Sequence, residues 1–113
     1  TIVVEKKFKG VMLEAYGIPQ DSPDDEAIKR IVKYDPMPGL QALEKGTSLP
    51  KTIIYHGAKD VNIPPDTSAK MLAAALENAG GDVTLELFDD VEHNTYAMGK
   101  PMEDKLRIFF SVL

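Results

Sequence analysis

The sequence predicts an α/β fold with about three parallel strands joined by crossover helices. Strand-like and helix-like hydrophobic periods alternate along its 113 residues, and such alternation is typical of α/β proteins. Residues 52–56, TIIYH, form a run that is almost entirely β-branched or aromatic, as in a parallel strand that is covered on both faces. The composition supports a folded domain, because 43% of the residues are apolar and a chain of this length can bury a sizeable core.

Two elements are expected in the first third of the chain. Residues 8–15, FKGVMLEA, have a short apolar centre that favours a strand at residues 11–14, although the periodicity alone is also compatible with a helix. A short surface helix follows, with Ser22 as its N-cap, Pro23 at its first helical position and acidic residues in its first turn. This helix is expected to end before Pro36, because the residue that precedes a proline disfavours the helical conformation.

The rest of the chain repeats the order of strand and helix. After the TIIYH strand, residues 66–79 place apolar side chains on one helix face, with Asp66 as the expected N-cap and Gly80 as the stop. Residues 83–88 alternate apolar and polar side chains, which indicates a strand with one face only partly buried. Pro101 is then expected to open the last helix.

Composition and charge exclude several classes of partner and cofactor. The net charge is −5 and there is no long block of lysines or arginines, so we expect neither a nucleic-acid partner nor a membrane partner. No apolar run approaches the roughly 18–20 residues of a membrane span. The sequence has no cysteine, which excludes disulfides and thiolate-bound metals. Its two histidines lack the HExxH spacing, so neither a metal nor a cofactor is expected.

Asp60 and His93 are the candidate site residues. Asp60 follows the strand at residues 52–56, and His93 follows the strand that ends near Phe88. Because open parallel sheets carry their ligand chemistry beyond the carboxyl ends of the strands, we expect both residues at the same edge of the sheet. An aspartate beside a histidine is the pair that orients an imidazole and stabilises its cation while the imidazole transfers a proton.

Each of these residues also has a purely structural interpretation. Asp60 could stabilise a turn, and His93 could be a surface histidine. The shared position at the ends of two strands favours the functional interpretation of Asp60, whereas that of His93 rests mainly on the family resemblance given below. His56, the other histidine, stands beside Gly57 at a strand end, and we expect it to pack or to form a structural hydrogen bond rather than to take part in chemistry.

Three motifs resemble the C-terminal part of an α/β-hydrolase, and in particular the prolyl oligopeptidase-like peptidases and esterases. IIYHGAKDVNIP is similar to the family's strand and His-Gly-x-x-Asp-x-x-Val/Ile-Pro loop, SAKMLAAALENAGGDVTLELF to the helix and strand that follow, and VEHNTY to the loop with the catalytic histidine. The resemblance runs from about Phe8 to Leu113 and implies a single, partial α/β-hydrolase domain over residues 1–113. Residues 17–50 would be a variable insertion before the acid-bearing strand.

The resemblance implies a serine hydrolase that cleaves an ester or peptide bond of a small-molecule substrate. Asp60 matches the acid and His93 the base of a Ser-His-Asp triad. The family's nucleophile lies in a Gly-x-Ser-x-Gly turn before the acid, and this sequence has no such motif. Ser48, in GTSLP, is a poor match, because Pro50 stands in place of the second glycine and Ser48 precedes a strand. We therefore expect the N-terminal half of a hydrolase domain as a partner and no activity from this chain alone.

A second class of function stays open. The chain could be a non-catalytic α/β module, or the partner-dependent structural half of a split hydrolase. The two classes differ in whether a Gly-x-Ser-x-Gly segment precedes Thr1 in the gene or lies in a partner chain.

Overall fold

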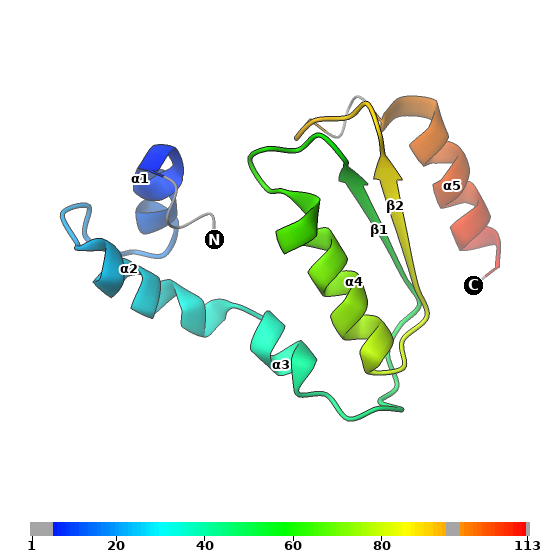
Figure 1. The fold of residues 1–113 in the computed structure, drawn as a ribbon, viewed down its shortest axis with the longest axis horizontal. Helices are drawn as coiled ribbons and strands as arrows, with labels where there is room; N and C mark the ends of the chain where they lie inside the picture. Colours follow the sequence, from blue (N-terminus) through cyan, green and yellow to red (C-terminus); the bar gives the residue numbers. More distant parts are fainter. Residues whose placement is uncertain (1–5, 95–97, 113) are drawn as a thin grey trace. The chain divides into compact units, whose positions relative to one another are not determined.

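The computed structural model describes residues 6–94 and 98–112 (Figure 1). The chain divides into two compact units, Thr1–Pro38 and Gly39–Leu113, and the short helix α3 (Met37–Gln41) contains the boundary between them. Within the described ranges, no helix is long and apolar enough to cross a membrane. The extent of the insertion at residues 17–50 stays a prediction.

The first unit is helical. It contains α1 (Lys6–Ala15), α2 (Asp24–Ile31) and the 3-10 helix η2 (Val32–Tyr34). Its core is a cluster of four buried side chains: Leu13, Ile18, Ala27 and Ile31. Met12 packs against this cluster, so α1 and α2 each contribute an apolar face to the same small core.

The strand predicted at residues 11–14 is wrong, because these residues lie inside α1. In FKGVMLEA, Val11 is the only β-branched residue, whereas lysine, methionine, leucine, glutamate and alanine favour a helix. The helix also explains the exposure of the side chains, since Leu13 is 1% exposed and Val11 is 66% exposed. The apolar run that suggested a strand therefore belongs to an amphipathic helix, in which Leu13 faces the core and Val11 faces solvent.

Helix α2 confirms the short helix expected before Pro36, with a shift of one residue at its start. It begins at Asp24, so Pro23 occupies the N-cap position that was expected for Ser22. Acidic residues fill its first turn and basic residues its last turn, which complements the helix dipole. The helical path continues through η2 as far as Tyr34.

The second unit is a pair of parallel strands between two helices. β1 (Thr52–Gly57) and β2 (Val83–Phe88) pair in register, from Thr52 opposite Val83 to Gly57 opposite Phe88. α4 (Ala69–Asn78) connects the two strands, and α4 and α5 (Gly99–Ser111) lie on opposite sides of the strand pair (Figure 1). The parallel pairing is as predicted, but the described residues form a sheet of two strands instead of about three.

Helix α4 ends where the sequence predicts and begins elsewhere. Its buried face consists of three alanines: Ala69, Ala73 and Ala75. Gly80 follows its C-terminal end with a φ of +93°, a left-handed conformation that glycine adopts without steric cost. The prediction that Asp66 is the N-cap is wrong, because Asp66 lies in the 3-10 helix η3 (Pro65–Thr67) and its carboxylate pairs with Lys70 at 2.6 Å.

The strand pair is only half-buried. Every residue of β1 before the buried Gly57 has intermediate exposure, so the described residues do not provide the full coverage expected for residues 52–56. Helix α5 contributes an ion pair between Lys105 and Glu86 at 2.9 Å. Phe110 on the same helix is 65% exposed. The second unit therefore leaves apolar side chains partly exposed on β1 and exposed on α5.

Candidate active site

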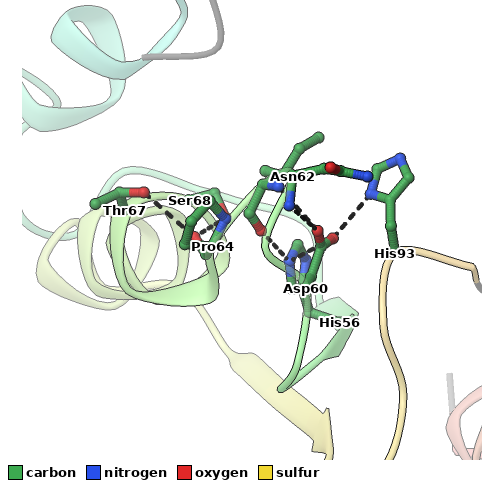
Figure 2. A network of polar contacts seen from close by, with 8 residues as sticks. His56, Asp60, Asn62, Pro64, Thr67, Ser68 and His93 are labelled. Carbon is green, nitrogen blue, oxygen red and sulfur yellow. Dashed lines mark hydrogen bonds and ion pairs between the residues drawn. The ribbon is translucent and has the colours of Figure 1, made fainter. Parts of the chain in front are cut away.

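The two candidate residues meet beyond the carboxyl ends of the strands. β1 ends at Gly57 and β2 ends at the paired Phe88, so the loops that follow start side by side. Asp60 lies in the first loop and His93 in the second, and their side chains point toward each other (Figure 2). The distance between His93 Nδ1 and Asp60 Oδ2 is 2.9 Å. The contact expected from the strand-end positions is present.

Both oxygens of the Asp60 carboxylate are engaged. Oδ1 accepts the backbone N–H of Asn62 at 3.0 Å and that of Ile63 at 2.8 Å, while Oδ2 faces His93. Asp60 is 5% exposed and is the one charged residue that is buried in the described part of the chain. A buried carboxylate is tolerated when its lone pairs are satisfied in this way. The loop thus fixes the rotation of the carboxylate as well as its position.

The pKa of Asp60 lies below the ordinary value of an aspartate. Burial by itself raises this pKa, but the hydrogen bond from Ile63, the hydrogen bond and charge of His93 and the hydrogen bond from Asn62 together lower it by more. Asp60 is therefore an ionised acceptor at neutral pH. Because a carboxylate accepts only, His93 Nδ1 carries the proton of their hydrogen bond.

This arrangement fixes the tautomer of His93. With the proton on Nδ1, the lone pair of a neutral imidazole is on Nε2 at the opposite edge of the ring. The His93 side chain is 54% exposed, whereas the carboxylate behind it is buried. A base with one nitrogen held by an anion and the other turned outward is suited to take a proton from a group that approaches from outside the chain.

Backbone hydrogen bonds hold the two loops together. The Lys59 N–H donates to the Val91 carbonyl at 3.0 Å, and the Ala58 N–H donates to the Phe88 carbonyl at 3.0 Å. The bond from Lys59 to Val91 therefore attaches the loop that carries Asp60 to the loop that carries His93, within two residues of each side chain. The position of one side chain relative to the other is set by this backbone contact.

Gly57 permits the close approach of the two loops. A Cβ atom at this position would lie 2.2 Å from the Glu92 carbonyl oxygen and 2.3 Å from the Val91 carbonyl oxygen, closer than any side-chain carbon can come. This role of Gly57 was not predicted from the sequence. The available signal was a glycine at the end of a strand, which often marks a site of close backbone approach.

His56 lies beside Oδ2 of Asp60, the same carboxylate oxygen that faces His93. Its Nε2 is 2.8 Å from the Ile63 carbonyl oxygen and 3.4 Å from Asp60 Oδ2 (Figure 2). The expected structural hydrogen bond is present. The proximity of His56 to the carboxylate was not predicted, although His56 is the first residue of the same His-Gly-x-x-Asp motif.

Neither Ser48 nor Ser68 completes a triad with this pair. Ser48 lies before the amino end of β1, while Asp60 lies beyond its carboxyl end, so the strand's rise separates them by roughly 20 Å. Ser68 is turned to the carbonyl of Pro64, to which its hydroxyl donates at 2.8 Å. In the described ranges, no group of three or more histidine, aspartate or glutamate side chains is placed to hold a metal ion.

A parallel strand pair whose carboxyl ends bring an ionised aspartate to a histidine is typical of serine hydrolases. A comparison with protein-family models matches residues 6–110 to the prolyl oligopeptidase family. The chain belongs to this family, which consists of serine hydrolases with the α/β-hydrolase fold. Searches of the curated proteins and of the solved structures found no significant match.

Proposed function

We propose that this chain supplies the acid, Asp60, and the base, His93, of a Ser-His-Asp triad that hydrolyses ester or peptide bonds. The observation that carries the proposal is the 2.9 Å contact between His93 Nδ1 and a buried carboxylate whose other oxygen is held by two backbone N–H groups. Membership of the prolyl oligopeptidase family supports it.

In the proposed reaction, a serine Oγ attacks the substrate carbonyl carbon while His93 Nε2 takes the Oγ proton. The bond to the leaving group then breaks, and Nε2 returns the proton to the departing amine or alcohol. Water repeats the sequence on the acyl-serine, releasing the acid and restoring the serine. Asp60 keeps the proton on Nδ1 and stabilises the imidazolium that forms twice in the cycle.

The nucleophile is proposed to lie outside this chain, in the N-terminal half of the hydrolase domain. The sequence contains no Gly-x-Ser-x-Gly motif, which the family's turn between strand and helix requires. The intermediate exposure along β1 supports the proposal that this strand joins a larger sheet. The chain on its own is then predicted to be inactive, because an imidazole without a nucleophile and an oxyanion hole lacks most of the catalytic machinery.

Because the sequence lacks that motif, one alternative to the hydrolase remains: the chain is a non-catalytic α/β module or the structural half of a split hydrolase. The gene sequence before Thr1 separates the alternatives. A strand, a Gly-x-Ser-x-Gly segment and a helix in that region support the hydrolase. If neither that region nor a partner chain encodes such a segment, the proposal fails.

Labelling with a fluorophosphonate probe tests the proposed roles on the full-length protein, because the probe reacts with a serine that a histidine activates. We expect His93→Ala to slow labelling by at least a hundredfold and Asp60→Asn to slow it strongly as well. Glu92→Gln and Asp90→Asn are matched controls, because both residues are exposed neighbours of the site and should label at the normal rate. Equal labelling of His93→Ala and the unmodified protein would contradict the proposal.

A further inference from the structure

His56 makes two contacts through one ring nitrogen. It is the residue before the last in β1, and its side chain is 17% exposed. Nε2 lies 2.8 Å from the Ile63 carbonyl oxygen and 3.4 Å from Asp60 Oδ2. Both of these neighbours are acceptors, so the chemistry of the partners determines which atom carries the proton.

The Ile63 carbonyl assigns the tautomer of His56. A carbonyl oxygen only accepts, so Nε2 must carry a proton for the 2.8 Å contact to be a hydrogen bond. The same N–H edge then faces the ionised Asp60 Oδ2, to which it adds a weaker electrostatic attraction at 3.4 Å. His56 therefore presents a donor to the side of the carboxylate that also accepts from His93.

Ile63 is held at both of its backbone polar groups. Its carbonyl accepts from His56 at 2.8 Å, and its N–H donates to Asp60 Oδ1 at 2.8 Å. The hydrogen bond between the Ile63 carbonyl and the His56 side chain therefore links the end of the loop at residues 57–63 back to strand β1. Asp60 is one of the residues of this loop. Loss of the His56 contact would therefore move the Ile63 N–H, which is the donor that fixes Asp60 Oδ1.

We propose that His56 is a positioning residue for the hydrolytic reaction: it anchors the Ile63 carbonyl and flanks Asp60 Oδ2, and so keeps that oxygen directed at His93 Nδ1. This inference rests on the proposed function, in which Asp60 and His93 are the acid and the base. His56 itself need not touch the substrate. It acts on the reaction through the orientation of the carboxylate.

Two substitutions distinguish the effect of the His56 hydrogen-bond donor from the effect of its side-chain volume. His56→Leu removes the N–H, whereas His56→Gln places an amide N–H near the original Nε2 position. In the full-length hydrolase we expect His56→Leu to lower kcat by about ten- to a hundredfold with little change in KM, since a misplaced catalytic group costs rates of this order. His56→Gln is expected to recover most of the lost kcat.

A second readout does not depend on turnover. The carboxyl carbon resonance of Asp60, followed by NMR against pH, reports the Asp60 pKa. We expect this pKa to rise toward its ordinary value in His56→Leu, because the Ile63 N–H that lowers it is no longer held. It should stay low in His56→Gln. Should His56→Leu fail to fold, His56→Asn serves in its place, because its amide is too short to reach the Ile63 carbonyl.

The outcomes distinguish this inference from the proposed function. If Asp60→Asn and His93→Ala keep their turnover, the proposed function fails. If those variants lose turnover while His56→Leu keeps its kcat and a low Asp60 pKa, the positioning role of His56 fails alone. Equal losses of kcat in His56→Leu and His56→Gln, with the Asp60 pKa unchanged in both, would also overturn it.

Discussion

Replacing Gly57 by alanine should separate the two loops that carry Asp60 and His93. The added Cβ would lie 2.2 Å from the Glu92 carbonyl oxygen and 2.3 Å from the Val91 carbonyl oxygen. Ordinary contacts between carbon and a carbonyl oxygen begin at about 3.3 Å. Because both clashing atoms belong to the backbone, rotation of a side chain cannot relieve the contact. The His93 loop must retreat by about 1 Å.

That displacement is large relative to the geometry of the site. His93 follows Glu92 directly, so a retreat of this size would stretch the 2.9 Å contact between His93 Nδ1 and Asp60 Oδ2 beyond hydrogen-bond distance. Overpacking of this kind costs about 1–3 kcal/mol in the free energy of unfolding. A 1 Å misplacement of a catalytic group costs about a hundredfold in rate. We therefore expect Gly57→Ala to reduce both stability and turnover.

Two assays test this prediction. Urea denaturation measures the loss in the free energy of unfolding, and kcat of the proposed full-length hydrolase measures the loss in rate. Gly39→Ala is the matched control, because a Cβ at Gly39 in α3 meets nothing within 4 Å and alanine favours a helix by up to about 1 kcal/mol. A Gly57→Ala variant that unfolds and turns over like the unmodified protein would refute the role of the close approach.

The remaining predictions concern acid sensitivity and a buried hydroxyl. The folded chain holds the pKa of Asp60 below its ordinary value, so the stability from this carboxylate is complete above the unfolded-state pKa of about 4 and is lost as the pH falls through the lower folded-state pKa. Urea denaturation between pH 7 and acid should show this loss in the unmodified chain and a smaller one in Asp60→Asn; equal acid dependence in both would count against it. The Tyr55 hydroxyl is buried and, among the described residues, has no hydrogen-bond partner. Tyr55→Phe should therefore leave the free energy of unfolding unchanged or raise it by up to about 1 kcal/mol, and thermal melts that show a clear loss would contradict this.

The second unit was largely predictable because its signals are local and mutually consistent. The β-branched run of β1 and the alternating pattern of β2 indicate strands, and Gly80 marks the end of α4. Since parallel strands place their carboxyl ends together, the meeting of Asp60 and His93 follows from topology once the two strands are paired.

The errors arose where a short pattern supports two structures. The apolar centre of residues 8–15 fits a strand or a helix face, and packing of Leu13 against residues of α2 decides for the helix. The contributions of His56 and Gly57 depend on distances across two loops, because a hydrogen bond to Ile63 and a close backbone approach leave no periodic trace in the sequence. Such contacts become visible only when the loops are placed in space.

Turnover of His93→Ala in the proposed full-length hydrolase tests the central claim most directly. The assay compares kcat/KM for hydrolysis of an ester and of a peptide substrate by the unmodified protein, His93→Ala and the exposed-neighbour control Glu92→Gln. If His93 is the base of the triad, its loss should lower kcat/KM by several orders of magnitude, about 10⁴-fold or more, while Glu92→Gln stays within about twofold of the unmodified protein. Near-normal hydrolysis by His93→Ala would contradict the assignment of Asp60 and His93 as the acid and base of a serine hydrolase.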